Sequence, residues 1–303
     1  MSVLAVDIGG TKVAVAAVAR DGRILRKTHQ PTDLRGYAEV VNQIVTMSRA
    51  VLDGEAIFAV GLSAPAVIDR ATERILWAPN LPGWEDIDLK GLVSARFGVP
   101  ASIEYDGHAA ALGEWWGGAG RGCQSLASIV IGTGIGAGFI EEGRLWRGYN
   151  RLAGAVGWFP IHTEDGIVSW EQAASGAGIV RAARRRIERG APTCLQPDGL
   201  TAKQVFAAAR QQDALACQVM EETARYIGLG VASVISFANP QVVVLGGSIG
   251  RHSDLILPSV RQIAAEWAQP YAARDVLIVP STLGEEAGLL GAAYSAFEQF
   301  ERQ

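Results

Sequence analysis

The chain is poor in cysteine, and its first residues contain no long apolar run. Its 303 residues include three cysteines, Cys123, Cys194 and Cys217, which form no CxxC pair. This scarcity argues against a disulfide framework and favours a reducing compartment. The N-terminal residues also lack a basic region followed by an apolar stretch. We therefore expect no signal peptide, no membrane span and a cytoplasmic location.

Charge is also scarce, at 19% of residues, and the net charge of -4 comes without a basic stripe. A nucleic-acid or anionic membrane partner would require clustered Lys and Arg, so we expect neither. Hydrophobic residues, in contrast, make up 49% of the chain. A chain of this length and composition can form one large or two medium domains with buried cores.

Two segments repeat the same pattern of an apolar strand, a glycine turn and a second apolar strand, at 3–18 and 126–140. The second repeat begins with a strand over 126–131. Helical spacing follows the first repeat over 37–52 and 89–97 and the second over 176–189, which predicts an α/β fold in two related halves. The glycine segment 117–122 marks the expected boundary. We therefore expect an N-terminal domain over 1–117, joined by the C-terminal helix 288–303, and a larger domain over 118–287.

Asp106 is the residue with the clearest chemical meaning, because it stands between a strand-like run and a helix-like run. Such a corner lies at the carboxyl edge of a sheet, where open α/β folds bind their ligands. A carboxylate at that position can accept the proton of a reacting hydroxyl. His108, two residues later, is expected to be structural.

The first glycine turn, Gly9-Gly10-Thr11-Lys12, follows Asp7. Glycines let backbone N–H groups approach phosphate oxygens, Thr11 adds a hydroxyl donor and Lys12 a cation. Asp7 can hold a hydrated Mg²⁺. An ordinary hairpin turn remains the alternative, and the Walker A spacing is absent.

The second turn contains Gly132, Thr133 and Gly134 and also follows an apolar strand. Two such turns with an Asp-bearing corner between them favour phosphate binding over two unrelated hairpins. A dinucleotide-binding fingerprint is disfavoured, because the turn leads into a strand and not into a helix. Together with Asp106, the turns predict transfer of a phosphoryl group to a hydroxyl.

Two further segments have competing interpretations. Gly246 and Gly247 end a strand and can lie against an adenine and its ribose, or form an ordinary strand-to-helix turn. Asn80, in a Pro/Gly loop, can be a buried amide that binds a sugar hydroxyl, or a residue that caps a turn. Four tryptophans are expected to pack in the interior or to face a sugar ring: Trp115, Trp116, Trp158 and Trp170.

The sequence resembles the ROK family, which holds bacterial glucokinases, fructokinases, N-acetylhexosamine kinases and sugar-responsive repressors. The resemblance covers nearly the whole chain and rests on five segments in the family order: 7–12, 80–84, 106–114, 132–136 and 245–248. It implies an actin-like, hexokinase-type fold of two α/β domains, with ATP and sugar in a cleft, and a homodimer. Because the first strand begins at residue 3, with no helix-turn-helix before it, the kinase branch is expected.

The resemblance also implies roles for particular residues. Asp106 would be the catalytic base, while Thr11 and Thr133 would face the γ-phosphate. Asn80, Asp106 and Glu171 would contact the sugar. Tyr105 stands where many members carry a sugar-binding Asn, so it joins the sugar-binding set.

The chain departs from the family pattern in two segments. Gly154-Ala155-Val156-Gly157-Trp158 replaces the usual Gly-Glu-Ile-Gly-His, so a sugar-contacting Glu and a His that binds sugar and zinc are both lost. The family's zinc-binding cysteines are missing from 162–171, which retains only Glu171. Without thiolates there is no tetrahedral site, so we expect no structural zinc.

The prediction is thus an ATP- and Mg²⁺-dependent kinase that phosphorylates O6 of a hexose or an N-acylhexosamine. Polyphosphate as the donor stays open. The alternative is a degenerate family member that binds sugar or nucleotide as a sensor, motivated by Ala155 and Trp158. Retention of Asp106 and of both glycine turns favours the enzyme.

Overall fold

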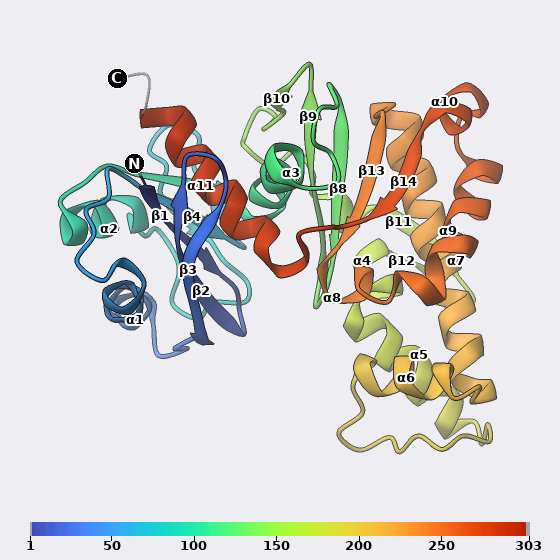
Figure 1. Ribbon diagram of the computed structural model, residues 1–303. Coiled ribbons are helices and arrows are strands. Elements are labelled where there is room, and N and C mark those ends of the chain that lie inside the picture. The colour runs from blue at the N-terminus through green and yellow to red at the C-terminus, as the bar shows by residue number, and fades with distance from the viewer. Residues whose placement is uncertain (1, 301–303) are drawn as a thin grey trace. The chain divides into compact units, whose positions relative to one another are not determined.

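The computed structural model describes residues 2–300, which form two compact units (Figure 1). The first unit consists of 2–124, 138–154 and 285–300, and the second of 125–137 and 155–284. Each unit contains a sheet with parallel strands and packed helices, so the predicted α/β class is confirmed. Among the described residues, no helix combines the length and apolarity required to cross a membrane.

The sheet of the first unit has five strands in the order β3-β2-β1-β4-β7. Its antiparallel part is β3 (Ile24–Pro31), β2 (Lys12–Ala19) and β1 (Ser2–Ile8). Its parallel part continues from β1 to β4 (Val60–Ala64) and β7 (Ala101–Tyr105). Because β1, β4 and β7 run in the same direction, their carboxyl ends meet at one edge of this sheet.

Helices cover both faces of this sheet (Figure 1). Helices α1 (Tyr37–Leu52) and α2 (Leu89–Phe97) share a hydrophobic core with Val60 and Leu62 of β4. The intervening Gly61 points to the opposite face, where an added Cβ would lie 1.9 Å from the carbonyl oxygen of Ala292 in α11 (Ala287–Phe300). Helix α3 (Asp106–Gly117) packs against α11, so the helix that begins with Asp106 is tied to this layer.

A small antiparallel pair, β5 (Val67–Ile68) and β6 (Ile75–Trp77), precedes the loop of Asn80. Strand β9 (Ile135–Glu141) begins in the second unit and ends in the first, where it pairs with β10 (Arg144–Leu145). The 3-10 turn η2 (Gly284–Glu286) leads into α11.

In the second unit, β13 (Val242–Gly246) lies between two parallel neighbours, β8 (Leu126–Ile131) and β14 (Leu277–Pro280). A second antiparallel pair, β11 (Pro160–Thr163) and β12 (Gly166–Ser169), follows the 3-10 turn η1 (Val156–Trp158). The helices of this unit are α4 (Trp170–Ala174), α5 (Gly176–Glu188), α6 (Ala202–Arg210), α7 (Ala214–Ala238), α8 (Gly247–Gly250), α9 (Ser253–Trp267) and α10 (Pro270–Asp275).

Candidate active site

Three polar residues meet at the carboxyl edge of the first sheet. Asp7 of β1 is opposite Ser63 of β4, and Asp106 follows directly after β7 as the first residue of α3. The Ser63 hydroxyl donates a hydrogen bond of 2.7 Å to Asp7 Oδ1. The parallel register, and not closeness in sequence, brings these side chains to one place.

Both carboxylates have raised pKa values, and the charge of Asp7 acts on Asp106. Burial, reinforced by the negative charge of Asp7, raises the pKa of Asp106 to about 7. The Gly107 N–H, which donates to Asp106 Oδ1 over 2.7 Å, and the Tyr105 hydroxyl oppose this rise. Burial also raises the pKa of Asp7, against the Ser63 hydrogen bond and the charge of Lys12. A carboxylate with a pKa near neutrality is suited to act as a general base.

The first glycine turn joins β1 to β2 beside these carboxylates. Gly9 N–H donates to the carbonyl of Lys12 over 2.8 Å, and the Thr32 hydroxyl donates to the carbonyl of Gly9 over 2.6 Å. Lys12 forms an ion pair with Glu285, while Thr11 is exposed. The backbone of the turn is thus fixed, and the Thr11 hydroxyl is accessible.

The loop of Asn80 lies against this turn, since an added Cβ at Gly10 would lie 3.0 Å from Asn80 Cβ. The structure thereby brings Asn80 to the same part of the unit. The side chain is exposed, however, so the expectation of a buried amide is wrong. The loop turns its apolar residues Ala78 and Leu81 inward, and Pro79 and Asn80 between them are exposed.

Buried groups behind Asp106 hold the strand and helix that carry it. Glu104 is 2% exposed and accepts hydrogen bonds from Arg147 Nε, at 3.2 Å to each carboxylate oxygen, and from the Ser295 hydroxyl, also over 3.2 Å. His108 is fully buried, and its Nε2 lies 2.7 Å from the Ala153 carbonyl. Burial lowers the pKa of His108, so the imidazole is neutral near pH 7, which fits the structural role expected for it.

The second glycine turn lies in the other unit, between β8 and β9. Gly132 N–H donates to the carbonyl of Gly134 over 2.8 Å, and Gly176, the first residue of α5, donates to the carbonyl of Gly132 over 2.8 Å. The N-terminus of α5 therefore lies beside the turn, and helix N-termini favour anions.

The Gly246–Gly247 segment is adjacent to this turn. Gly247 has φ +80°, and an added Cβ there would lie 2.4 Å from the carbonyl oxygen of Ile131. Ser248 Oγ is 3.7 Å from the Cβ position of Gly132. Both glycine segments thus approach the end of β8, and Gly132 of the turn and Ser248, which follows Gly247, line one pocket.

This pocket is open, with a volume of about 900 Å³, and all its lining residues belong to the second unit. Gly132, Thr133, Gly176 and Ser248 form its glycine-rich part. One face of α5 forms another part, because the lining positions recur every three or four residues along the helix: Ala177, Val180, Arg181, Arg184, Arg185 and Glu188. No motif marks this face in the sequence, although it belongs to the helix predicted over 176–189.

The arginines of this face differ in their partners. Arg184 Nε donates to the carbonyl of Pro197 over 3.1 Å, and Arg185 forms an ion pair with Asp165. Arg181 is exposed and has no hydrogen bond or ion pair within residues 2–300. It is therefore free to meet a negatively charged ligand in the pocket.

Glu171, in α4, is near the second turn, because its Oε2 accepts a hydrogen bond of 2.9 Å from Ile135 N–H. The segment that replaces the family's zinc ligands is the β11–β12 hairpin. Within residues 2–300 we find no group of three or more His, Cys, Asp or Glu side chains that could hold a metal ion.

The tryptophans do not all pack in the interior. Trp170 is fully buried, and Trp115 and Trp116 are partly buried. Trp158 is 77% exposed, so the expectation that it packs in the interior is wrong. It ends the turn η1, whose Val156 fills the interior position instead.

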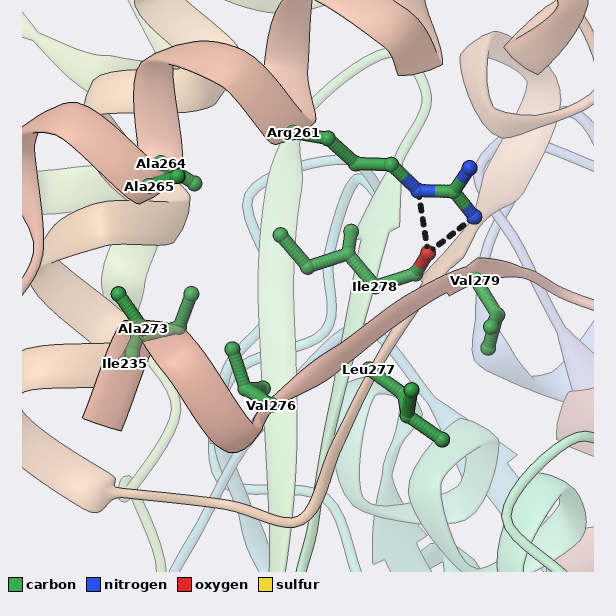
Figure 2. Close-up of a pocket in the computed structure, with 9 residues that line it drawn as sticks. All are labelled: Ile235, Arg261, Ala264, Ala265, Ala273, Val276, Leu277, Ile278 and Val279. Atoms are coloured by element: carbon green, nitrogen blue, oxygen red, sulfur yellow. Dashed lines mark hydrogen bonds between the residues drawn. The ribbon is translucent and has the colours of Figure 1, made fainter. Parts of the chain in front are cut away.

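A second, smaller pocket of about 260 Å³ lies between α7, α9, α10 and β14 (Figure 2). Its lining is apolar apart from Arg261. Figure 2 shows both Nε and Nη2 of Arg261 turned to the carbonyl oxygen of Ile278, at 2.9 and 2.6 Å. The guanidinium is thus used for structure, and this pocket shares no residue with the glycine turns.

Comparison with known proteins agrees with these features. The fold is that of the actin-like ATPases, and the chain is a phosphotransferase with an alcohol group as acceptor. It belongs to the ROK family, whose model matches residues 3–299.

The similar proteins align over nearly their whole length. A glucokinase from Streptomyces coelicolor is 34% identical over 311 residues, with 97% of both chains covered. The crystal structure of a ROK family glucokinase from Streptomyces griseus, in complex with glucose and AMPPNP, has a TM-score of 0.86 and 33% identity, covering 98% of this chain and all of the other. A ROK hexokinase structure from Thermus thermophilus has a TM-score of 0.80 and 28% identity, with full coverage of both chains.

Proposed function

We propose that this chain is a homodimeric, ATP-dependent sugar kinase that transfers the γ-phosphate to O6 of a hexose or an N-acylhexosamine. One observation supports it above all others: a partly buried carboxylate, Asp106, has a pKa near neutrality at the carboxyl edge of a parallel sheet. Nearly full-length similarity to glucokinases supports a sugar as the acceptor. A partly buried base of this kind serves proton abstraction, which pure ligand binding does not require.

In this reaction Asp106 accepts the proton of the sugar hydroxyl as its oxygen attacks the γ-phosphorus in line. Tyr105 and the Gly107 N–H hold the carboxylate. Asn80, Tyr105 and Glu171 bind other hydroxyls of the sugar. Glu171 Oε2 is already engaged by Ile135 N–H, which orients the carboxylate and leaves its other oxygen as an acceptor.

The phosphate donor is bound by the glycine segments. We assign the triphosphate to Gly132, Thr133 and Gly134 together with the α5 N-terminus, and the nucleoside to the side of Gly246 and Gly247. Gly9, Gly10, Thr11 and Lys12 supply further N–H, hydroxyl and ammonium donors for the transferred phosphoryl group. Preformed donors of this kind stabilise negative charge without reorganisation during the reaction.

Mg²⁺ supplies charge neutralisation for the triphosphate in kinases of this type. Asp7 fits such an ion: its Oδ1 is held by Ser63, and no hydrogen bond is found for Oδ2 among the described residues. Mg²⁺ keeps most of its water ligands and needs only one or two carboxylates beside the substrate phosphates. A single aspartate beside the first glycine turn is therefore sufficient as the protein ligand of the ion.

A coupled ADP-release assay over glucose, mannose, fructose, N-acetylglucosamine and N-acetylmannosamine tests the proposed function. Turnover of at least one sugar with ATP and Mg²⁺ supports it. Sugar binding in calorimetry without any turnover would instead identify a sensor. Replacing ATP by polyphosphate in the same assay determines the donor.

The nucleotide assignment predicts the effect of removing Arg181. We expect Arg181→Ala to raise the KM for ATP about fivefold, the loss of one exposed charge–phosphate contact, with kcat and the sugar KM nearly unchanged. Arg189→Ala is the matched control, because Arg189 is exposed and follows the last residue of α5 outside the pocket. Equal ATP KM values for both variants would refute the assignment.

The missing thiolates predict that the purified protein carries no structural zinc. Metal analysis by mass spectrometry should find far less than one zinc per chain, and a chelator should leave the melting temperature unchanged. Structural zinc sites contribute folding energy directly, so their loss would be visible in melting. One stoichiometric zinc would contradict this prediction.

A further inference from the structure

Trp158 is a large apolar side chain in an exposed position, and its backbone is rigid. The indole is 77% exposed, yet the preceding Val156 is 3% exposed. The following Phe159 stacks on the buried Trp170, with ring centroids 6.4 Å apart and planes inclined by 12°. The backbone N–H of Trp170 also donates a hydrogen bond of 2.7 Å to the Phe159 carbonyl. The indole therefore projects from a fixed turn and not from a loose loop.

This turn lies beside Glu171. An added Cβ at Gly157 would lie 2.3 Å from the carbonyl oxygen of Ile135 and 3.4 Å from Glu171 Cβ. No side chain larger than glycine fits there without moving the backbone of the second glycine turn. The close approach places Gly157, the residue directly before Trp158, against Glu171 within one unit.

The surface formed by Glu171, Ala155 and Trp158 combines one polar group with two apolar ones. Glu171 offers a carboxylate oxygen that accepts from hydroxyls. Its neighbours on the η1 side, Ala155 and Trp158, are exposed and offer a methyl group and an aromatic face. A sugar hydroxyl facing them would lose its hydrogen bonds to water without a replacement, which is unfavourable. An apolar substituent in the same place would gain contact with the indole.

We propose that Trp158 is a specificity-determining residue whose indole contacts the acyl group of an N-acylhexosamine while Glu171 binds a neighbouring hydroxyl. The inference rests on the proposed kinase function and refines it by naming the substrate class. It makes the chain a kinase that prefers 2-acylamino sugars to the corresponding hexoses.

The experiment compares kcat/KM for N-acetylmannosamine and mannose, and for N-acetylglucosamine and glucose. We expect the wild type to favour the acylated sugar of at least one pair. Trp158→Ala should lower that preference about tenfold, and Trp158→Phe should retain most of it, because a phenyl ring keeps the aromatic face. Trp267→Ala is the matched control, since Trp267 is 65% exposed at the end of α9.

Three results would overturn the inference: a wild type that prefers both plain hexoses, a preference that survives Trp158→Ala, or an equal loss in Trp267→Ala. A fluorescence readout separates this question from turnover. Saturating N-acetylmannosamine or N-acetylglucosamine should protect one tryptophan from acrylamide in the wild type but not in Trp158→Phe. Protection without turnover would refute the kinase and keep the contact, whereas turnover without protection would refute the contact alone.

Discussion

Replacement of Asp106 by Asn should abolish most turnover and at the same time stabilise the protein above neutral pH. A general base contributes about 10²–10⁴-fold to the rate, so we expect kcat to fall within that range. The Asn side chain keeps the oxygen that accepts from Gly107 N–H, so ATP binding should change little. Steady-state kinetics and ATP calorimetry on the same preparation measure both effects.

The pH dependence of the wild type follows from the same carboxylate. Only the ionised form accepts a proton, and the pKa of Asp106 is raised to about 7. We therefore expect kcat/KM to rise with pH up to about 7 and to level off above it, because kcat/KM reports the free enzyme. A profile that is flat from pH 5 to 8 would show that another group accepts the proton.

The stability effect has the opposite sign from that of a salt-bridged aspartate. Because the folded-state pKa of about 7 exceeds the ordinary 3.8, the folded state binds the proton more tightly than the unfolded state. The contribution of Asp106 to the free energy of unfolding is thus fully present below pH 4 and is lost as the pH rises to about 7. A rise of the pKa from 3.8 to about 7 corresponds to a loss of unfolding free energy on the order of 4 kcal/mol, which Asp106→Asn should recover.

Thermal melting of wild type and variant between pH 4 and 8 tests this sign. The difference in melting temperature should grow with pH and become constant above about 7. Asp198→Asn is the matched control for removing one negative charge, because Asp198 is exposed and has no hydrogen bond or ion pair within residues 2–300. If both variants melt alike at pH 8, the burial of Asp106 has no energetic consequence.

The sequence predicts well those elements whose apolar pattern is continuous. Helices were expected over 37–52 and 89–97 and a strand over 126–131, and α1, α2 and β8 have these bounds. Strand β3 was not predicted, because its residues Ile24–Pro31 are mostly polar and exposed at the edge of the sheet. This segment forms a strand because it pairs with β2, and no pattern in its own residues indicates that pairing.

The same distinction applies to the candidate site. Asp106 was identified locally, from the strand before it and the helix after it. The contact of Ser63 with Asp7 joins residues 56 positions apart and depends on the register of β1 and β4. The exposure of Trp158 was missed for a related reason: whether a 3-10 turn directs one side chain outward depends on what the next residue packs against.

Replacement of Gly113 by Ala should cause a large loss of stability, although it adds one methyl group. An added Cβ at Gly113 of α3 would lie 2.1 Å from the carbonyl oxygen of Ala287 in α11. The approach is reciprocal, since an added Cβ at Gly291 of α11 would lie 1.7 Å from the carbonyl oxygen of Ala109 in α3. Backbone atoms cannot rotate away as a side chain can, so the two helices must separate.

We expect Gly113→Ala to cost about 3 kcal/mol or more, at or above the upper range of overpacking. Gly117→Ala is the matched control: Gly117 is in the same helix and has no atom within 4 Å of its added Cβ. There the methyl group should stabilise by up to about 1 kcal/mol, because alanine favours the helix. Urea unfolding measures both. Because α3 begins with Asp106, surviving Gly113→Ala protein should also lose kcat, and equal unfolding midpoints would show that the helices adapt without cost.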